Sequence, residues 1–201
     1  MTIQPLASAE ISTDLEKKVA VLARQLTAAR ENVHKVIIGQ QSVVDLCLTS
    51  ILSGGHFLIM GLPGLGKTKL VETLGTVLGF DAKRVQCTPD LMPADIVGSE
   101  ILSTDGGGER SFRFIKGPIF CQLLMADEIN RASPRTQSAL LQAMQEYQVS
   151  VGGTTYDLAR PFHVMATQNP LEQEGTYPLP EAQLDRFIMQ IDIGYPTLAD
   201  E

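Results

Sequence analysis

Cysteine is scarce in this sequence, and its distribution excludes two kinds of site. The three cysteines, Cys47, Cys87 and Cys121, stand far apart among 201 residues. Neither a zinc site nor a dithiol redox motif has this spacing, because both need closely paired ligands. We expect buried free thiols in a reducing compartment.

The sequence also lacks a basic excess and a long apolar segment. It has 16 Lys and Arg against 23 Asp and Glu, a formal net charge of −7, so no positive field marks a nucleic-acid or membrane surface. No segment approaches the roughly 20 apolar residues that cross a bilayer, and residues 1–10 show no basic leader. We expect a cytoplasmic protein without membrane contact. Nucleic-acid binding is disfavoured, although scattered lysines could line the pore of a ring.

Apolar periodicity and turn residues predict one continuous α/β domain. With 44% hydrophobic residues, the chain can form one sizeable core. Helical patterns cover residues 14–34, 43–52 and 70–78, and a further helix begins at Pro134; strand patterns cover 56–60, 84–87, 121–126, 162–167 and 188–193. Strands that alternate with helices predict a parallel sheet. Two inserted hairpins are expected, one with its turn at 105–108 and one over 148–158.

Residues 61–68, Gly-Leu-Pro-Gly-Leu-Gly-Lys-Thr, match the phosphate-loop pattern between a predicted strand and a predicted helix. The glycines let backbone N–H groups point inward, and the helix N-terminus adds a positive dipole end. Lys67 would reach the β and γ phosphates, and Thr68 would place its hydroxyl on Mg²⁺. The alternative is a glycine-rich turn with an exposed lysine. The predicted ATP-binding residues here are Gly61, Leu62, Pro63, Gly64, Leu65, Gly66, Lys67, Thr68 and Lys69.

An acidic pair, Asp127-Glu128, directly follows the apolar strand at 121–126. Parallel sheets bind ligands at the carboxyl ends of their strands. Asp127 can hold magnesium, usually through water, and Glu128 can orient and deprotonate the attacking water. The alternative is a pair of acids that caps the helix beginning near Pro134. The sequence has no Asn-Lys-x-Asp guanine motif, which favours adenine.

Asn169 follows the predicted strand at 162–167 and is expected at the same ligand edge. Its amide could orient the lytic water against the γ phosphate. An asparagine that simply starts a turn before Pro170 is a serious alternative, because asparagine and proline are common turn residues.

Taken together, these motifs resemble the MoxR family of AAA+ ATPases over nearly the whole sequence. Beyond the phosphate loop, the resemblance rests on the segments 36–40 (VIIGQ), 88–96 (TPDLMPADI), 116–118 (KGP), 126–132 (ADEINRA), 166–170 (ATQNP) and 180–187 (PEAQLDRF). The implied fold is a P-loop αβα sandwich with a central parallel five-stranded sheet and inserted β-hairpins. The resemblance also implies that both hairpins could face the pore of a ring.

The same resemblance implies further site residues and partners. Ile38 and Gly39 would lie near the adenine, Asn169 would sense the γ phosphate, and Arg186 would be the arginine finger that acts on a neighbouring subunit's ATP. Without the motif, Arg186 would be interpreted as a surface salt-bridge residue. Arg131 could lie at the subunit seam. The family forms rings, usually hexamers, that remodel or activate client proteins, often ones with von Willebrand factor A domains.

The sequence departs from the family at its C-terminal end. The family continues into a helical lid with a second sensor arginine, whereas this sequence ends at Glu201. The expected organisation is an N-terminal helical segment, 1–35, and an ATPase core, 36–201, without the lid. Because lids couple closure to turnover, hydrolysis is left open, as are truncation, a split gene and a natural short form. A P-loop kinase, an ATP-binding scaffold and a DNA-linked motor are the competing functions.

Overall fold

The computed structural model describes residues 13–104, 110–171 and 174–194. The major helices are α1 (Thr13–His34), α2 (Gln41–Leu52), α3 (Lys67–Leu78) and α5 (Pro134–Glu146), and short helical turns form α4 (Pro93–Val97), η1 (Ile129–Arg131) and α6 (Glu181–Leu184). The core strands are β1 (Phe57–Gly61), β2 (Ala82–Gln86), β5 (Leu123–Asp127), β8 (His163–Gln168) and β9 (Met189–Ile193). The hairpin strands are β3 (Gly98–Thr104), β4 (Arg110–Lys116), β6 (Gln148–Val151) and β7 (Thr154–Asp157).

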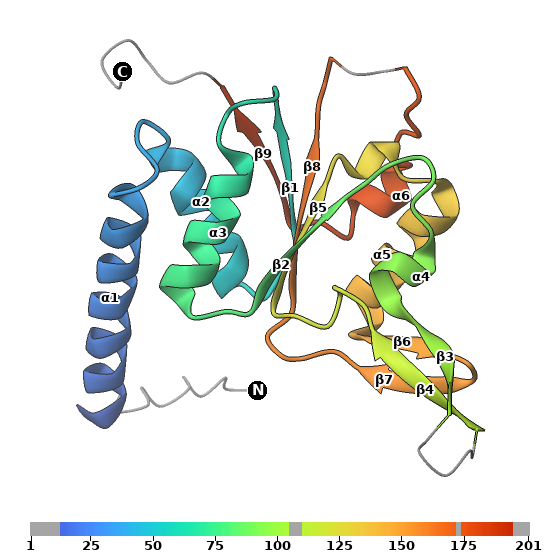
Figure 1. Cartoon of the computed structure of the whole chain (residues 1–201). Coiled ribbons are helices and arrows are strands. Elements are labelled where there is room, and N and C mark those ends of the chain that lie inside the picture. The colour runs from blue at the N-terminus through green and yellow to red at the C-terminus, as the bar shows by residue number, and fades with distance from the viewer. Residues whose placement is uncertain (1–12, 105–109, 172–173, 195–201) are drawn as a thin grey trace, which may run out of the picture.

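The central sheet has five strands in the order β2-β5-β8-β1-β9, and every pairing is parallel. The predicted fold class is therefore confirmed. Helices α1 to α3 lie on one side of the sheet, and α4 to α6 lie on the other (Figure 1). Strand β2 begins two residues earlier and ends one residue earlier than the predicted strand at 84–87, and it forms an edge of the sheet.

Alternating side chains of the core strands fill two separate cores. In β5, Leu124 and Ala126 pack on the α5 side, while Leu123 and Met125 pack on the α3 side. All four are no more than 1% exposed. Such continuous apolar strands are expected in a parallel sheet that is covered on both faces. The packing fixes β5 in the middle of the molecule, with its carboxyl end at the edge that carries the predicted site.

Both predicted hairpins are present. Strands β3 and β4 pair antiparallel from Gly98↔Lys116 to Thr104↔Arg110, and β6 pairs with β7. The glycine-rich turn predicted at 105–108 lies outside the described residues. So do residues 1–12 of the predicted N-terminal segment and residues 195–201 of the predicted ATPase core. The helical turns α4, η1 and α6 were not predicted, because each is too short for a helical repeat to show in the sequence.

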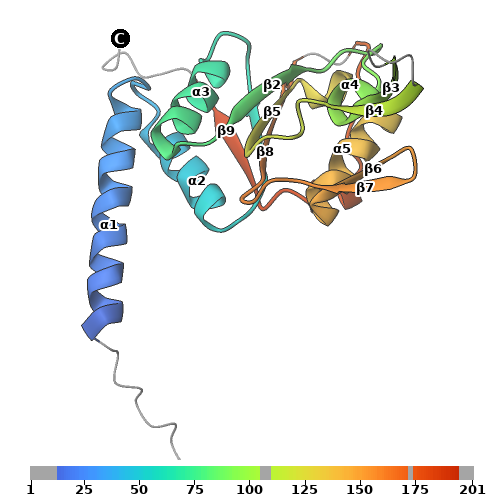
Figure 2. The same ribbon diagram turned by 60° about the horizontal axis from the view of Figure 1, so that its bottom comes forward.

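The predicted helix at 14–34 is confirmed as α1, but most of it stands away from the core (Figure 2). Val33 is 0% exposed, whereas Val19 and Leu22 are 57% and 63% exposed. The apolar stripe that predicted the helix is therefore covered by described residues only near its C-terminal end. None of the described helices combines the length and apolarity that a bilayer crossing requires.

The cysteine prediction is confirmed as far as burial and pairing are concerned. Cys47, Cys87 and Cys121 are free and buried. Burial raises the pKa of each thiol to about 12, so all three are unreactive structural residues at neutral pH.

A buried histidine predicts a loss of stability in acid. His56 Nδ1 accepts a hydrogen bond from the Val164 N–H at 2.9 Å, so its proton is on Nε2, which donates to Met144 O at 3.1 Å. Burial lowers the pKa of His56 from 6.5 to about 4. Because the unfolded chain binds this proton more readily, stability is complete above pH 6.5 and falls as the pH drops towards 4.

We expect His56 to account for about 3 kcal/mol of lost unfolding free energy between pH 7 and pH 4. Urea unfolding of the wild type and of His56→Gln at both pH values measures this contribution. The variant should lose less free energy than the wild type over that range, because glutamine does not titrate. Equal losses in the two proteins would contradict the assignment.

Candidate nucleotide site

The predicted phosphate loop lies between β1 and α3, as its sequence context required. Gly64 and Gly66 have φ angles of +86° and +75°, and a Cβ added to either would meet no atom within 4 Å. Glycine is therefore favoured at both positions by the positive φ angle of the backbone and not by a lack of space for a side chain. Leu65, 7% exposed, anchors the loop in the core. The loop thus has the positive-φ glycine geometry that a phosphate cradle uses.

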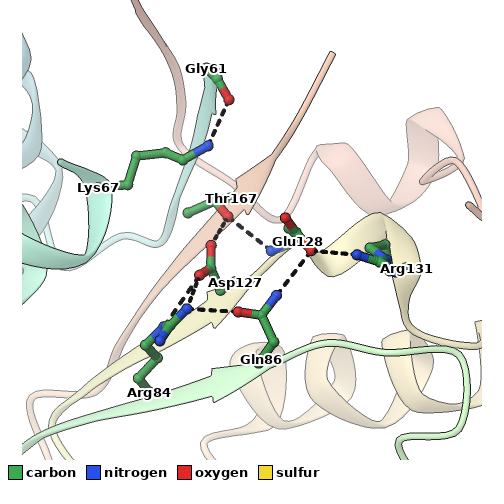
Figure 3. Close-up of polar contacts among 8 residues, drawn as sticks. All are labelled: Gly61, Lys67, Arg84, Gln86, Asp127, Glu128, Arg131 and Thr167. Carbon is green, nitrogen blue, oxygen red and sulfur yellow. Dashed lines mark hydrogen bonds and ion pairs between the residues drawn. The ribbon is translucent and has the colours of Figure 1, made fainter. Parts of the chain in front are cut away.

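The lysine of the loop is held by the loop itself. Lys67 Nζ donates to Gly61 O at 2.6 Å (Figure 3). Burial lowers the pKa of Lys67, and the charges of Asp127 and Glu128 partly offset that effect. An ammonium group that is partly removed from water interacts more strongly with a phosphate than one that is fully hydrated.

The segment at 36–40 reaches the phosphate loop through one hydrogen bond. Gln40 Nε2 donates to Leu65 O at 3.1 Å. Gly39 has a φ of 71°, and Ile38 is 66% exposed. The predicted adenine-contacting pair therefore lies next to the loop, and Ile38 offers an uncovered apolar side chain for a flat ring.

The acidic pair ends β5 at the same edge of the sheet. Asp127 is 8% exposed, and its Oδ1 accepts a hydrogen bond from the Thr167 hydroxyl at 2.6 Å. The same hydroxyl accepts from the Glu128 N–H at 2.9 Å. Thr167, at the end of β8, therefore fixes both acidic residues through one oxygen atom (Figure 3).

Glu128 has an uncommon backbone conformation and two side-chain partners. Its φ and ψ are 55° and 51°, a left-handed geometry that costs a non-glycine residue about 1–3 kcal/mol and is concentrated at functional sites. Its Oε2 accepts from Gln86 Nε2 at 2.9 Å and from Arg131 at 3.1 Å. The alternative of a helix cap is not observed: the cap of α5 is the Ser133 side chain, which accepts from the Thr136 N–H.

The topology of the sheet brings Asn169 to the predicted ligand edge. Strand β8 is paired with β1 on one side and with β5 on the other, so its end lies between the phosphate loop and the acids. Asn169 Oδ1 also accepts from the Leu171 N–H at 3.2 Å, which is the turn contact of the competing interpretation. Asn169 is 8% exposed. It therefore makes the turn contact and also lies at the ligand edge of the sheet.

Arg186 lies at the end of the sheet where β1 and β9 begin, opposite to the end that carries the phosphate loop. It precedes β9, whose first residue, Met189, pairs with Phe57 at the start of β1. The five residues of β1 span about 16 Å at ~3.3 Å per residue, so Arg186 is far from its own phosphate loop. Its guanidinium donates to Gln145 Oε1 at 3.1 and 3.3 Å, and no ion pair among the described residues includes it.

The residues present fit a magnesium ion that is bound together with nucleotide. Thr68, the second residue of α3, and Asp127 supply hydroxyl and carboxylate oxygens, which Mg²⁺ prefers. No cluster of three or more His, Cys, Asp or Glu side chains occurs in the described part of the chain. Magnesium at this site would therefore depend on phosphate oxygens and water for its remaining ligands.

Sequence reasoning missed three polar side chains that the sheet brings to the acids. Arg84 binds Asp127 Oδ2 with NH2 at 2.6 Å and Nε at 3.2 Å. Gln86, two residues along β2, contacts Glu128, and Thr167 contacts both acids. The i, i+2 spacing of Arg84 and Gln86 placed them on one face of a strand. Only the pairing of β2 with β5, which sets Gln86 opposite Asp127, shows what that face meets.

Comparison with known proteins identifies the family. The model of the ATPase family associated with various cellular activities (AAA) matches residues 56–189. The chain is 48% identical over 183 residues to the chaperone MoxR1 of Mycobacterium tuberculosis, covering 91% of this chain and 48% of that protein. It is 49% identical over 176 residues to the uncharacterized protein YeaC of Bacillus subtilis, covering 88% and 54%.

A solved structure agrees with these relatives. A candidate ATPase from Cytophaga hutchinsonii, determined at 2.00 Å, superposes with a TM-score of 0.84 at 45% identity, covering 94% of this chain and 56% of that one. The fold is that of the P-loop ATPases of the AAA+ class. The chain belongs to the MoxR family within that class. It spans about half the length of the curated relatives that it matches.

The double hydrogen bond at Thr167 predicts a specific loss of stability. Thr167 is 0% exposed, and Thr167→Val keeps its shape but leaves the Glu128 N–H without its acceptor. We expect the free energy of unfolding to fall by about 1–3 kcal/mol, measured by urea denaturation. Thr167→Ser keeps the hydroxyl and is the matched control. A valine variant as stable as the wild type would refute the bonding role of this oxygen.

Proposed function

We propose that this chain binds and hydrolyses ATP, and that Glu128 activates the attacking water. One observation carries the proposal: the phosphate loop after β1 and the acids after β5 flank the end of β8 on one edge of the sheet. The loop amides and Lys67 bind the phosphates, with Leu62, Pro63 and Lys69 completing the loop. Asp127 and Thr68 hold Mg²⁺, which neutralises charge on the phosphates when it is bound.

The catalytic proton transfer falls to Glu128. Its carboxylate lies one residue beyond the metal-binding Asp127, and its backbone is fixed by Thr167. A water between Glu128 and the γ phosphate would attack phosphorus and pass its proton to the Glu128 carboxylate, at Oε1 because Oε2 is bound to Gln86 and Arg131. The bond from the γ phosphorus to the bridging oxygen of the β phosphate would break in the same step, and ADP would leave with that oxygen. Asn169 would orient that water from the end of β8, because its amide lies at the same edge.

We further propose that the site is completed by a second copy of the chain in a ring, hexameric as is usual in the family. Arg186 lies at the edge remote from its own phosphate loop, so its guanidinium can serve only a neighbour's γ phosphate. Arg131, which contacts Glu128, would lie near such a seam. Closed rings arise when one face of a subunit binds a different face of the next.

The relative named as a chaperone supports a role in remodelling or activating client proteins. The β3–β4 and β6–β7 hairpins are the parts of this chain best placed to contact a client. Leu102 and Phe112, paired across β3 and β4, are 54% and 73% exposed. An exposed apolar pair of this kind suits an unfolded segment or a protein surface, such as that of a von Willebrand factor A domain.

Replacement of the proposed base tests the catalytic assignment. Glu128→Gln should retain nucleotide binding and lower phosphate release by about 100-fold or more, because the amide cannot accept the proton. Glu146→Gln is the matched control: Glu146 is an exposed acid of α5 whose loss changes net charge equally. Normal phosphate release by Glu128→Gln would defeat the assignment. Tight binding without release in the wild type would indicate an ATP-binding scaffold instead.

Mixing two inactive variants tests the shared site. Lys67→Ala and Arg186→Ala should each lack activity. In an equal mixture, about one site in four combines an intact Lys67 with an intact neighbouring Arg186, so phosphate release should partly recover. Assembly size, measured in the presence of ATP, shows that rings form, and co-purification of differently tagged variants shows that the rings are mixed. Mixed assemblies of wild-type size without recovered activity would refute a site shared between subunits.

A further inference from the structure

The metal-binding carboxylate already has a cation bound to it. Arg84 NH2 and Asp127 Oδ2 are 2.6 Å apart, and Arg84 Nε contacts the same oxygen at 3.2 Å. The other oxygen, Oδ1, accepts from Thr167 at 2.6 Å. Oδ2 therefore receives two N–H groups and has used both of its lone pairs. Only the departure of Arg84 can free this oxygen for another partner.

The Arg84 guanidinium has two acceptors in the site, but the side chain is exposed enough to leave it. Its NH2 group also donates to Gln86 Oε1 at 2.7 Å, so two acceptors fix the guanidinium plane. Its side chain is nevertheless 46% exposed, against 11% for Asp127, and β2 is an edge strand. An arginine on an exposed edge can move into solvent, whereas the buried aspartate cannot follow it.

We propose that Arg84 competes with magnesium for Asp127 and thereby sets the magnesium concentration at which the site is completed. This inference rests on the proposed function, since it concerns the metal of the same nucleotide site. A guanidinium and a magnesium ion, or a water bound to that ion, cannot occupy Oδ2 together. Arg84 therefore neutralises Asp127 until nucleotide binds. Magnesium must displace Arg84 from Oδ2, and the free energy of that displacement lowers the affinity for magnesium.

The competition predicts a change in metal affinity without a comparable change in nucleotide affinity. In Arg84→Gln, Asp127 has no resident cation and the local repulsion of Mg²⁺ is reduced. The half-saturating magnesium concentration should fall by about two- to fivefold, the range expected for a partly exposed ion pair. The affinity for nucleotide in the presence of a chelator should change less than the magnesium midpoint.

The experiment is a magnesium titration followed by nucleotide fluorescence, which needs no turnover. A fluorescent ADP analogue is held at fixed concentration with the full chain, and Mg²⁺ is added to the wild type, Arg84→Gln, Arg84→Lys and Lys83→Gln. Lysine keeps the charge without the two-pronged geometry, so its midpoint should lie nearer the wild type. Lys83→Gln removes an adjacent charge on the same strand, where Lys83 contacts Phe120 O, and should not shift the midpoint.

The outcomes separate this inference from the proposed function. A lower midpoint in Arg84→Gln, partly restored by lysine and absent in Lys83→Gln, supports the competition. An unchanged or higher midpoint in Arg84→Gln, with nucleotide still bound, overturns it and leaves the proposed function intact. Failure of the wild type to bind the analogue at any magnesium concentration overturns both. Thermal unfolding of each variant without ligand shows that a shifted midpoint does not come from a damaged fold.

Discussion

The site depends on one constraint: strands β1, β8 and β5 run parallel and lie side by side, so their carboxyl ends meet at one edge. The hydrogen bond from Thr167 to Asp127, at 2.6 Å, locks the ends of β8 and β5 together. From the order of the strands follow the place of Asn169 at the end of β8 and the separation of the acids from the phosphate loop by one strand. Arg186 is excluded from this edge by the same alignment.

The acids and the lysine of the site each have a partner within the chain. Asp127 is paired with Arg84, Glu128 with Arg131, and Lys67 with the carbonyl of Gly61. Each of these contacts satisfies a charged group that would otherwise be costly to hold out of water. Nucleotide and metal must therefore exchange partners with residues of the chain, and their net affinity is the difference between new contacts and those given up.

Local sequence patterns predicted the parts of the structure that local physics determines. The glycine spacing at 61–68 and the apolar strand before Asp127 predicted the cradle, the acids and the five strands, because each pattern lies within one segment. Arg84 and Thr167 were not predicted as site residues, because their meeting with Asp127 depends on the order of strands in the sheet. The exposure of α1 was equally hidden, since a helical stripe predicts a covered face without saying what covers it.

The most direct test of the account is a calorimetric titration of the wild-type chain with the magnesium complex of a non-hydrolysable ATP analogue. The account predicts saturable heat with one nucleotide per chain, because the open glycine loop, Lys67 and Asp127 together form one anion and metal site. The absence of heat from a folded sample would contradict the proposal, because the glycine loop, Lys67 and Asp127 would then not form a nucleotide site.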